Sequence, residues 1–453
     1  MATLKITGDS KKMGDIMDAI ISSGYIKVCD NEILVQDEKE KNVYERFESV
    51  DLQRKIYEML PAESRTEFSV PFIKELIERM RRMPELVYQE QREEQKNYVR
   101  VKNGIFNVNQ GKVTEDEKLI FRYCYNFHYL PNQTLEDTKH FKEFIETSFE
   151  GQYMEGKTEL LLQILGYCLS GYTEGKVAFF LVGVSNSGKS VVLDLMKEVL
   201  GKGNYSTLEL SKLSMRFNKI LLKDSKVNIC DEISGIEFKG LDVFKAVVSG
   251  EEITGERKGQ DPMSFHVQTK LLSAGNVFPH IRNTQGLDAL ENRMVVLAFS
   301  KAIVKDLQNL NLREDLKKER DVIFSLALDA LTRLKDNRFQ FQMDSESKQL
   351  LKNYIRELNS LDQFYEECLE PVHDIQKAKT DNGRMHLVEL WEMFTKYCAE
   401  NLVEPSVRKN ELSNFLQSKG FVKKRFRKGK RNAWGFEGIR MKKTWNDGTL
   451  EQE

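Results

Sequence analysis

Residues 183–190 read GVSNSGKS and have the types and spacing of a phosphate-binding loop, G-x-x-x-x-G-K-[ST]. Glycines let consecutive backbone N–H groups turn toward one anion, and a helix starting at the end of the loop adds the positive end of its dipole. The lysine of such a loop reaches the β- and γ-phosphates, and the next hydroxyl binds Mg²⁺. The sequence therefore predicts a nucleoside triphosphate site made by Gly183, Val184, Ser185, Asn186, Ser187, Gly188, Lys189 and Ser190.

The elements expected on both sides of this loop fit that chemistry. Residues 177–182 form a continuous apolar run of strand length. Residues 191–200 are apolar at helical spacing and stop before Gly201. A strand, a glycine loop and a helix in this order favour phosphate binding over a chance glycine turn.

Two adjacent carboxylates, Asp231 and Glu232, follow the apolar run 226–230. An acidic pair at the carboxyl end of a strand is what triphosphate hydrolysis requires. We expect Asp231 to hold Mg²⁺ through water and Glu232 to orient or deprotonate the attacking water. The alternative is a solvated strand end without a catalytic role.

Two further polar residues flank apolar strands of the same region. Asn276 follows residues 269–275 and could bond both the γ-phosphate and the attacking water, although an asparagine before a proline-containing turn is also a common turn former. Arg293 precedes the apolar run 294–299 and is the candidate arginine finger. A finger acting across a subunit boundary implies a ring, whereas a surface ion pair is the alternative for Arg293.

The composition limits the class of protein. The chain has 453 residues, 40% of them hydrophobic and 31% charged, so we expect about three domains. A net charge of −1 means that nucleic-acid affinity must come from local basic patches. The scattered cysteines and histidines form no metal-ligand spacing. No apolar run approaches the roughly 20 residues of a membrane span, and the N-terminus lacks a signal-peptide core, so we expect a cytoplasmic protein without a membrane partner.

The order of expected elements divides the chain into four regions. Residues 1–135 mix strands (25–29 and 32–36), an amphipathic helix (72–83) and a hairpin (103–113). Residues 136–300 contain the loop, and the alternating strands and helices from 177 onward predict an α/β fold, with a parallel sheet covered by helices on both faces. Residues 301–375 read as helices, and residues 376–453 as a linker followed by a small basic domain.

The small basic domain has the element pattern of a winged helix. We expect helices at 384–397 and 409–420, then strands at 421–427 and 433–441. Its cations, interleaved with aromatic residues, are Lys423, Lys424, Arg425, Arg427, Lys428, Lys430 and Arg431. With these cations on phosphates and the helix near 408–419 in the major groove, the domain would bind origin duplex DNA. A solvated charged hairpin or a protein-binding domain are the alternatives.

At these motifs the chain resembles the superfamily 3 helicases. It looks most like the branch found in phage and plasmid primase-helicases and in replication initiators of phage-inducible chromosomal islands. The resemblance covers roughly residues 100–370 and depends on GVSNSGKS, on the acidic pair at 231–232, on KLLSAGN at 270–276 with Pro279, and on NRM at 292–294. The lead-in NGIF at 103–106 and the segment NSLDQFYEEC at 359–368 also match.

This resemblance implies an AAA+ fold, a homo-hexameric ring, ATP with Mg²⁺, and 3′-to-5′ translocation on single-stranded DNA. It also implies a hairpin between the acidic pair and Asn276, whose basic tip, here Arg257 and Lys258, follows DNA phosphates in the pore. Many relatives carry an N-terminal primase domain. The first hundred residues here show no matching acidic motif, so we expect no primer synthesis and a possible ring-closing collar.

The leading hypothesis is a hexameric DNA helicase that initiates replication of a mobile genetic element and acts on single-stranded, forked and origin DNA. One alternative is an ATP-switched origin-binding protein without processive unwinding. Another is a motor that packages or remodels protein.

Overall fold

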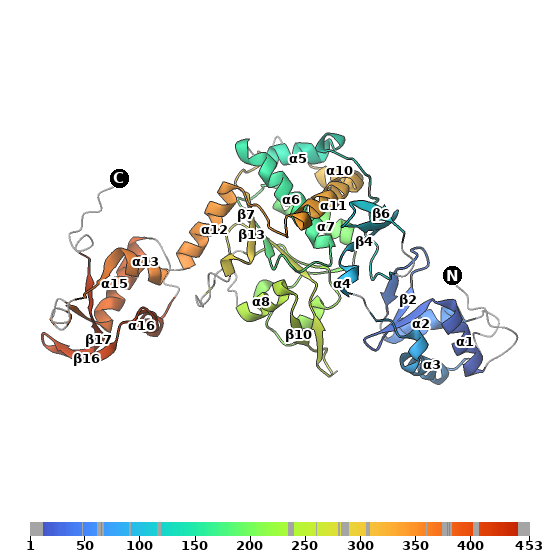
Figure 1. Ribbon diagram of the computed structural model, residues 1–453, viewed down its shortest axis with the longest axis horizontal. Helices are drawn as coiled ribbons and strands as arrows, with labels where there is room; N and C mark the ends of the chain where they lie inside the picture. The colour runs from blue at the N-terminus through green and yellow to red at the C-terminus, as the bar shows by residue number, and fades with distance from the viewer. Residues whose placement is uncertain are drawn as a thin grey trace.

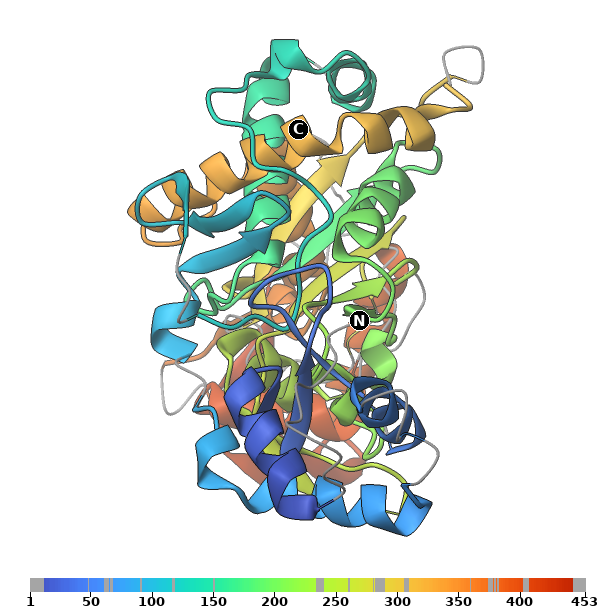
Figure 2. The same ribbon diagram turned by 90° about the vertical axis from the view of Figure 1, so that its right-hand side faces the viewer.

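The computed structural model describes residues 12–47, 49–60, 65, 68–89, 92–115, 119–149, 151–233, 240–259, 261–279, 281, 290–304, 309–358, 360–373, 378, 380, 383–401 and 407–442. A central body lies between a smaller N-terminal part and a smaller C-terminal part (Figure 1). Turned by 90°, the molecule presents the N-terminal helices in front of this body (Figure 2). The buried apolar side chains form separate clusters in the three parts.

The N-terminal part packs three helices against a small antiparallel sheet. Its elements are α1 (Met13–Ser23), β1 (Ile26–Cys29), β2 (Glu32–Gln36), β3 (Tyr44–Arg46), α2 (Ser49–Met59) and α3 (Val70–Arg82). The strands predicted at 25–29 and 32–36 and the helix predicted at 72–83 are confirmed. Helix α3 is held by its buried stripe of Ile73, Leu76, Ile77 and Met80, at helical spacing.

A second small sheet and several helices lead into the central body. The elements are η2 (Pro84–Leu86), α4 (Arg92–Gln95), β4 (Tyr98–Val101), β5 (Gly104–Asn107), β6 (Lys112–Thr114), η3 (Leu135–Asp137), α5 (His140–Ser148), η4 (Gly151–Tyr153) and α6 (Met154–Leu169). The hairpin predicted at 103–113 is the antiparallel β5–β6 pair. Buried residues of β4 and β5 belong to the same cluster as α6, so this sheet packs onto the central body.

The central body contains a five-stranded parallel sheet in the order β13-β7-β12-β9-β8. The strands are β7 (Ala178–Gly183), β8 (Tyr205–Ser206), β9 (Val227–Cys230), β12 (Lys270–Gly275) and β13 (Met294–Phe299). Between them lie α7 (Lys189–Leu200), η5 (Leu210–Lys212), η6 (Lys219–Leu222) and α8 (Leu241–Ser249), and α10 (Leu312–Lys318), α11 (Arg320–Asp336) and α12 (Ser345–Leu358) follow. The predicted parallel sheet and the helices predicted after residue 300 are confirmed.

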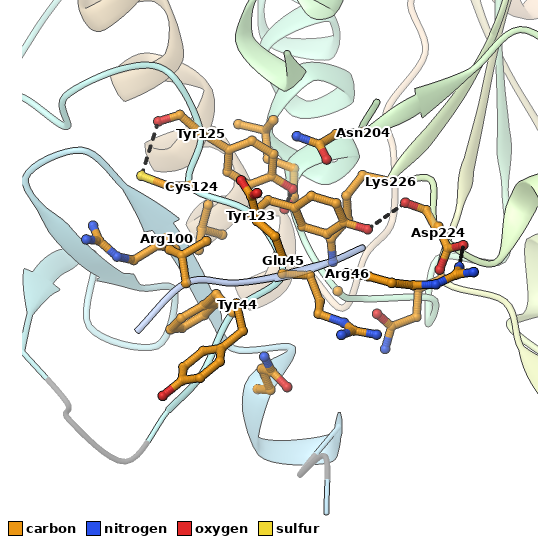
Figure 3. A pocket seen from close by; sticks show the side chains of 18 of the residues that line it. Tyr44, Glu45, Arg46, Arg100, Tyr123, Cys124, Tyr125, Asn204, Asp224 and Lys226 are labelled. Carbon is orange, nitrogen blue, oxygen red and sulfur yellow. Dashed lines mark hydrogen bonds and ion pairs between the residues drawn. The ribbon is translucent and has the colours of Figure 1, made fainter. Parts of the chain in front are cut away.

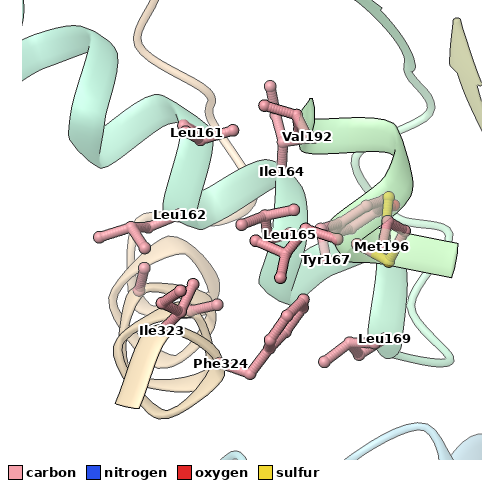
Figure 4. Close-up of a cluster of buried hydrophobic side chains, with 14 of the residues drawn as sticks. Leu161, Leu162, Ile164, Leu165, Tyr167, Leu169, Val192, Met196, Ile323 and Phe324 are labelled. Atoms are coloured by element: carbon pink, nitrogen blue, oxygen red, sulfur yellow. The ribbon is translucent and has the colours of Figure 1, made fainter. Parts of the chain in front are cut away.

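Helices cover both faces of this sheet, as the strand pattern requires. Successive side chains of a strand point to opposite faces. On β7, Phe179 and Leu181 join the cluster of α6, α7 and α11, whereas Phe180 and Val182 join that of α8 and α12. Figure 4 shows the first cluster where α6 meets α7 and α11. Burial on both faces explains why β7 is apolar along almost its whole length.

Between β9 and β12 the chain forms an antiparallel hairpin, β10 (Glu252–Gly255) and β11 (Met263–His266). The resemblance had implied a hairpin at this place in the chain. Strand β10 packs near η6, and α8 lies directly before it. The end of β10 that leads into the turn also contacts η6, where a Cβ at Gly255 would lie 3.0 Å from the Ile220 backbone nitrogen.

The C-terminal part contains α13 (Ser360–Cys368), β14 (Leu369–Pro371), β15 (Arg384–His386), α15 (Leu387–Glu400), α16 (Lys409–Ser418), β16 (Lys423–Lys428), β17 (Arg431–Glu437) and β18 (Ile439–Met441). The predicted succession of two helices and a strand pair is present. The prediction that the first helix starts at residue 384 was wrong, because residues 384–386 pair with β17 as strand β15. Most of the predicted linker at 376–383 lies outside the described residues.

The apolar clusters use successive stretches of the chain. One cluster uses residues between 16 and 86, two share the central sheet and reach residue 358, and one uses residues 361–439. Along the described ranges, no helix has the length and apolar character needed to cross a bilayer.

Candidate functional site

The loop at residues 183–190 connects the carboxyl end of β7 to the first turn of α7. Gly183 has φ +149°, and a Cβ there would lie 2.0 Å from the Phe299 carbonyl oxygen of β13. Gly188 has φ +99°, and its Cβ would lie 2.6 Å from Phe144 of α5. Both glycines of the motif are therefore required by backbone conformation and by close neighbours.

The loop presents a run of backbone donors. Among the described residues, the N–H groups of residues 185–190 donate to no protein acceptor. Regular bonding begins at Val191 and Val192, whose N–H groups both donate to the Gly188 carbonyl, at 3.1 and 3.3 Å. Open donors at the positive end of a helix dipole form a site for an anion such as phosphate.

The Lys189 ammonium lies inside this loop. Its Nζ donates to the carbonyl oxygens of Gly183 (2.8 Å) and Val184 (2.6 Å), and to Oδ1 of Asn276 (3.2 Å). The side chain is buried, and this burial lowers the pKa of Lys189, against the opposite effect of the Glu232 carboxylate. The charge of Glu232 therefore acts on the same ammonium that Asn276 bonds.

The register of the sheet explains why these groups meet. Gly275 of β12 lies beside Val182 of β7, and Cys230 of β9 lies beside Ser273 of β12. Because parallel strands share their carboxyl edge, the residues after β12 and β9 emerge next to the loop. The structure thus brings Asn276 and Glu232 to Lys189.

Asp231 is exposed and forms an ion pair with Lys197 of α7, with Nζ 2.8 Å from Oδ2. Lys197 lies two turns after Lys189 on the same helix and is also 3.7 Å from Asp194. The sequence reasoning had given Lys197 no role. The only available signal was its spacing of eight residues from Lys189, which places both on α7.

The residues fit a magnesium ion that arrives with a triphosphate. Ser190 is exposed in the first turn of α7, and Asp231 is exposed after β9. In the part of the chain that the structure describes, no group of three or more His, Cys, Asp or Glu could hold a metal ion. Mg²⁺ commonly keeps several waters and takes one or two protein oxygens together with substrate phosphates.

Arg293 lies at the opposite edge of the sheet. Its carbonyl accepts from the Ala178 N–H at 2.8 Å, at the start of β7, whereas the loop begins at the end of that strand. Five residues of strand separate the two edges by roughly 17 Å. The structure does not bring Arg293 to Lys189 of the same chain.

The two candidate residues at the β10–β11 tip differ in their surroundings. Arg257 lies 3.3 Å from Asp224 and 3.9 Å from Glu32 of β2, and both carboxylates also contact Arg46 of β3. Lys258 is exposed. Arg257 is therefore neutralised within the chain, and Lys258 is the more accessible cation.

Asp224, one partner of Arg257, borders a cavity of about 620 Å³ between the N-terminal part and the central body. Figure 3 shows Arg46 reaching Asp224, while the Tyr123 hydroxyl donates to the Asp224 carbonyl at 2.9 Å. Most cations lining it have carboxylate partners, such as Arg100 and Lys102 with Glu40. Glu32 and Arg46 of the N-terminal part thus meet Arg257 and Asp224 beside the β10–β11 turn.

The predicted cations of the C-terminal part lie on the antiparallel pair β16–β17 and its turn. Lys424 pairs with Glu437 and Lys428 with Glu389, both at 3.0 Å. The exposed residues are Lys424, Arg425, Arg427, Lys430 and Arg431, and Lys423 and Lys428 are half-buried. The seven cations therefore divide into a paired set and a more open set.

Comparison with known families gives two matches. Residues 11–150 match the family described as "D5 N terminal like", and residues 181–293 match a "Family of unknown function (DUF5906)". The second match includes the loop, the acidic pair, Asn276 and Arg293. The first covers the N-terminal region, to which the sequence reasoning assigned no chemistry.

Two curated proteins are similar to part of the chain. "Putative helicase L207/L206" of Acanthamoeba polyphaga mimivirus is 25% identical over 224 residues, covering 47% of this chain and 23% of that protein. "Putative helicase V13" of Sputnik virophage is 22% identical over 224 residues, covering 46% and 28%. The matched region thus spans about a quarter of the length of these relatives. With the D5 match, they support a relationship with phage and viral primase-helicases.

Solved structures of the NrS-1 C terminal region resemble the whole fold. One apo structure has a TM-score of 0.51 at 10% identity, covering 95% of this chain and all of that chain. Its A form has a TM-score of 0.50 at 10% identity, covering 94% and 98%. At this identity the likeness concerns the fold alone.

Proposed function

We propose that this chain is an ATP-driven DNA helicase and replication initiator of a mobile genetic element. The observation that carries the proposal is the loop after β7, which combines open N–H donors with the Lys189 ammonium that Asn276 bonds and on which the Glu232 carboxylate acts. This arrangement can bind a triphosphate and place a carboxylate and an amide near its end. The viral helicases similar to this chain support DNA unwinding as the use of the energy.

In the proposed site the N–H groups of residues 185–190 bind the phosphates of ATP. Lys189 exchanges its bonds to the loop carbonyls for the β- and γ-phosphates. Ser190 and Asp231 hold Mg²⁺, which neutralises charge on the phosphates when bound. Glu232 orients and deprotonates the attacking water, and Asn276 bonds the γ-phosphate and this water.

We further propose an AAA+ protein of superfamily 3 that works as a homo-hexamer. The strand order β13-β7-β12-β9-β8 supports this proposal, since it separates the loop strand from the acidic strand by the strand of Asn276. The position of Arg293 at the far edge also supports it, because a finger there serves a neighbouring subunit's site. Translocation from 3′ to 5′ follows from the resemblance.

The DNA contacts are assigned to two places. The exposed Lys258 on the β10–β11 turn would grip single-stranded phosphates as ATP turns over. The succession α15, α16, β16 and β17 supports a winged helix, which we propose binds origin duplex DNA. The rival proposal is an origin-binding protein for which ATP is only an assembly switch.

A forked-duplex unwinding assay, with origin-containing and random sequence compared, tests the function. The helicase proposal expects ATP-dependent strand separation by the wild type, and loss of both unwinding and DNA-stimulated hydrolysis in Lys258→Ala. Tight origin binding without any strand separation would favour the switch. Unwinding that survives Lys258→Ala would contradict the assigned pore contact.

A further inference from the structure

The hairpin formed by β16 and β17 has two chemically different faces. Side chains alternate along a strand, so Lys424, Phe426 and Lys428 lie on one face and Lys423, Arg425 and Arg427 on the other. The register pairs Arg425 with Trp434 and Arg427 with Asn432. We call the face of Lys423, Arg425, Arg427, Asn432 and Trp434 the outer face, and the opposite one the inner face.

The inner face is occupied by the protein itself. Phe426 stacks on His386 with ring centroids 4.8 Å apart, and a Cβ at Gly435 would lie 2.8 Å from the Phe426 ring. Lys424 is paired with Glu437. Lys428 is paired with Glu389, whose carboxylate also accepts from the His386 N–H at the start of α15. Both cations of this face therefore have a carboxylate partner within the protein, and Lys428 is also half-buried.

The outer face is buried at the base of the hairpin and exposed farther along it. At its base Phe436, which shares this face, is fully buried with residues of α15 and α16. Two residues earlier on the same face, Trp434 is 54% exposed. Arg425, directly opposite, and Arg427 are exposed too, and the turn adds the exposed Lys430. This surface combines a large aromatic ring with cations, and the outer face carries no carboxylate.

Such a combination fits one class of partner. The exposed indole offers a flat ring on which another ring can stack, and the surrounding cations favour a polyanion. Nucleic-acid bases have a π-face that can stack on an indole, but in a duplex that face is covered by neighbouring base pairs. An unpaired base, with the phosphates on either side of it, fits both the ring and the arginines.

We propose that Trp434 stacks on an unpaired base of single-stranded DNA while Arg425 and Arg427 bind the adjacent phosphates. The proposal rests on the DNA-binding role proposed above for the C-terminal part and adds a single-strand contact to its duplex contact. This part would then hold one strand of a melted origin or a fork. The inner-face lysines would contribute little to this contact.

The test uses the full chain in the Lys258→Ala background, which weakens the separate pore contact. Binding of a single-stranded oligonucleotide and of a blunt duplex of equal length is measured by fluorescence anisotropy. We expect Trp434→Ala to weaken single-strand binding about tenfold or more, with duplex binding changed less than about twofold. Trp434→Phe should retain most of the affinity, because a phenyl ring also stacks. Lys396→Ala removes an exposed lysine of α15 that lies outside the hairpin, so it is the matched control and should behave like the background.

A second readout does not depend on folding of the alanine variant. Stacking of a base quenches indole fluorescence, so single-stranded DNA should quench the emission of the starting chain, and Trp434→Phe should remove that quenching. Equal loss on duplex and single strand, no loss on either, or unchanged quenching in Trp434→Phe would each overturn the stacking contact. Absence of any DNA binding by the wild-type chain would instead overturn the proposed DNA role itself.

Discussion

The Lys189 ammonium donates a hydrogen bond to Oδ1 of Asn276 at 3.2 Å, which joins the loop after β7 to the end of β12. The bond holds the Asn276 side chain next to the Lys189 ammonium, within reach of a ligand that this ammonium binds. In the proposed reaction Lys189 moves to the phosphates, and the Asn276 amide then becomes available to the γ-phosphate and water. The two residues therefore connect nucleotide occupancy to the neighbouring strand.

We expect Asn276→Ala to bind ATP with little change and to hydrolyse it about 10²–10³ times more slowly, as is usual when one positioned polar group is lost. Nucleotide binding by fluorescence titration and hydrolysis by phosphate release measure the two effects separately. Equal weakening of binding and turnover would mean that Asn276 only supports the loop. Asn276→Asp is a second variant whose side chain has a similar size. Its added negative charge should disfavour the bound phosphate.

Lys189→Ala should abolish hydrolysis and strongly weaken ATP binding, because the loop loses the charged ammonium that contacts its carbonyls. Lys212→Ala is a matched control, since Lys212 is an exposed lysine of the same domain paired with Glu209 at 2.7 Å. That surface pair contributes about 1 kcal/mol or less. Appreciable turnover in Lys189→Ala would reject this nucleotide site.

Arg293→Ala should leave nucleotide binding intact and remove hydrolysis, because its charge is expected at a neighbour's phosphates. A mixture of Arg293→Ala chains with Lys189→Ala chains tests directly whether the arginine acts across subunits. A ring in which an intact loop meets an intact Arg293 from the adjacent chain should recover part of the activity. Sedimentation at the assay concentration establishes whether the wild-type chain is monomeric. Full hydrolysis by monomers would exclude a finger acting across subunits.

The strands of the central body and the polar residues at their ends could be predicted from the sequence, because they depend on local patterns of apolar and polar residues. Each apolar run ending in a polar group became a strand of the predicted type, and Asn276 did come to Lys189. The partner of Asp231 could not be predicted, because Lys197 meets it only after α7 packs against the sheet. The start of α15 was also missed, since strand pairing with β17 overrides the helical pattern of residues 384–386.

The surroundings of Arg257 show the same limit. Its neighbours Asp224 and Glu32 are 33 and 225 residues away in the sequence, and only the fold brings them together. The structure distinguishes the two tip residues by accessibility, because Lys258 is exposed and Arg257 is paired with these carboxylates.

This difference predicts distinct salt dependences of single-strand binding. Lys258→Ala should reduce the slope of log affinity against log salt by about 0.7 for each lost phosphate contact. Arg257→Ala should change that slope less, and should lower the melting temperature slightly because Asp224 and Glu32 lose a partner. Binding isotherms at several salt concentrations provide the measurement. Equal slopes for the two variants would show that Arg257 leaves its carboxylates to bind DNA.

Lys270 predicts a pH dependence of stability. It is buried at the start of β12, its Nζ donates to the Gln268 carbonyl at 2.5 Å and lies 5.4 Å from the Tyr167 ring centre. Burial, with a smaller effect of Lys226, lowers the pKa of Lys270 to about 7. The unfolded chain, with the ordinary value of about 10.4, therefore binds more protons between these limits. Stability attributable to this residue should rise with pH across that window, by up to about 1.4 kcal/mol per pH unit.

Lys270→Met removes the charge and keeps a side chain of similar length, so it isolates this contribution. Urea unfolding of the two proteins at about pH 6 and about pH 9.5 gives the comparison. The gain in unfolding free energy from the substitution should be larger at the lower pH, where the wild type buries a charged ammonium. Lys352→Met, at an exposed position of α12, should show no such pH-dependent difference. A constant difference between Lys270→Met and wild type at both pH values would mean that Lys270 remains protonated in the folded protein, with water or carbonyl groups stabilising its charge.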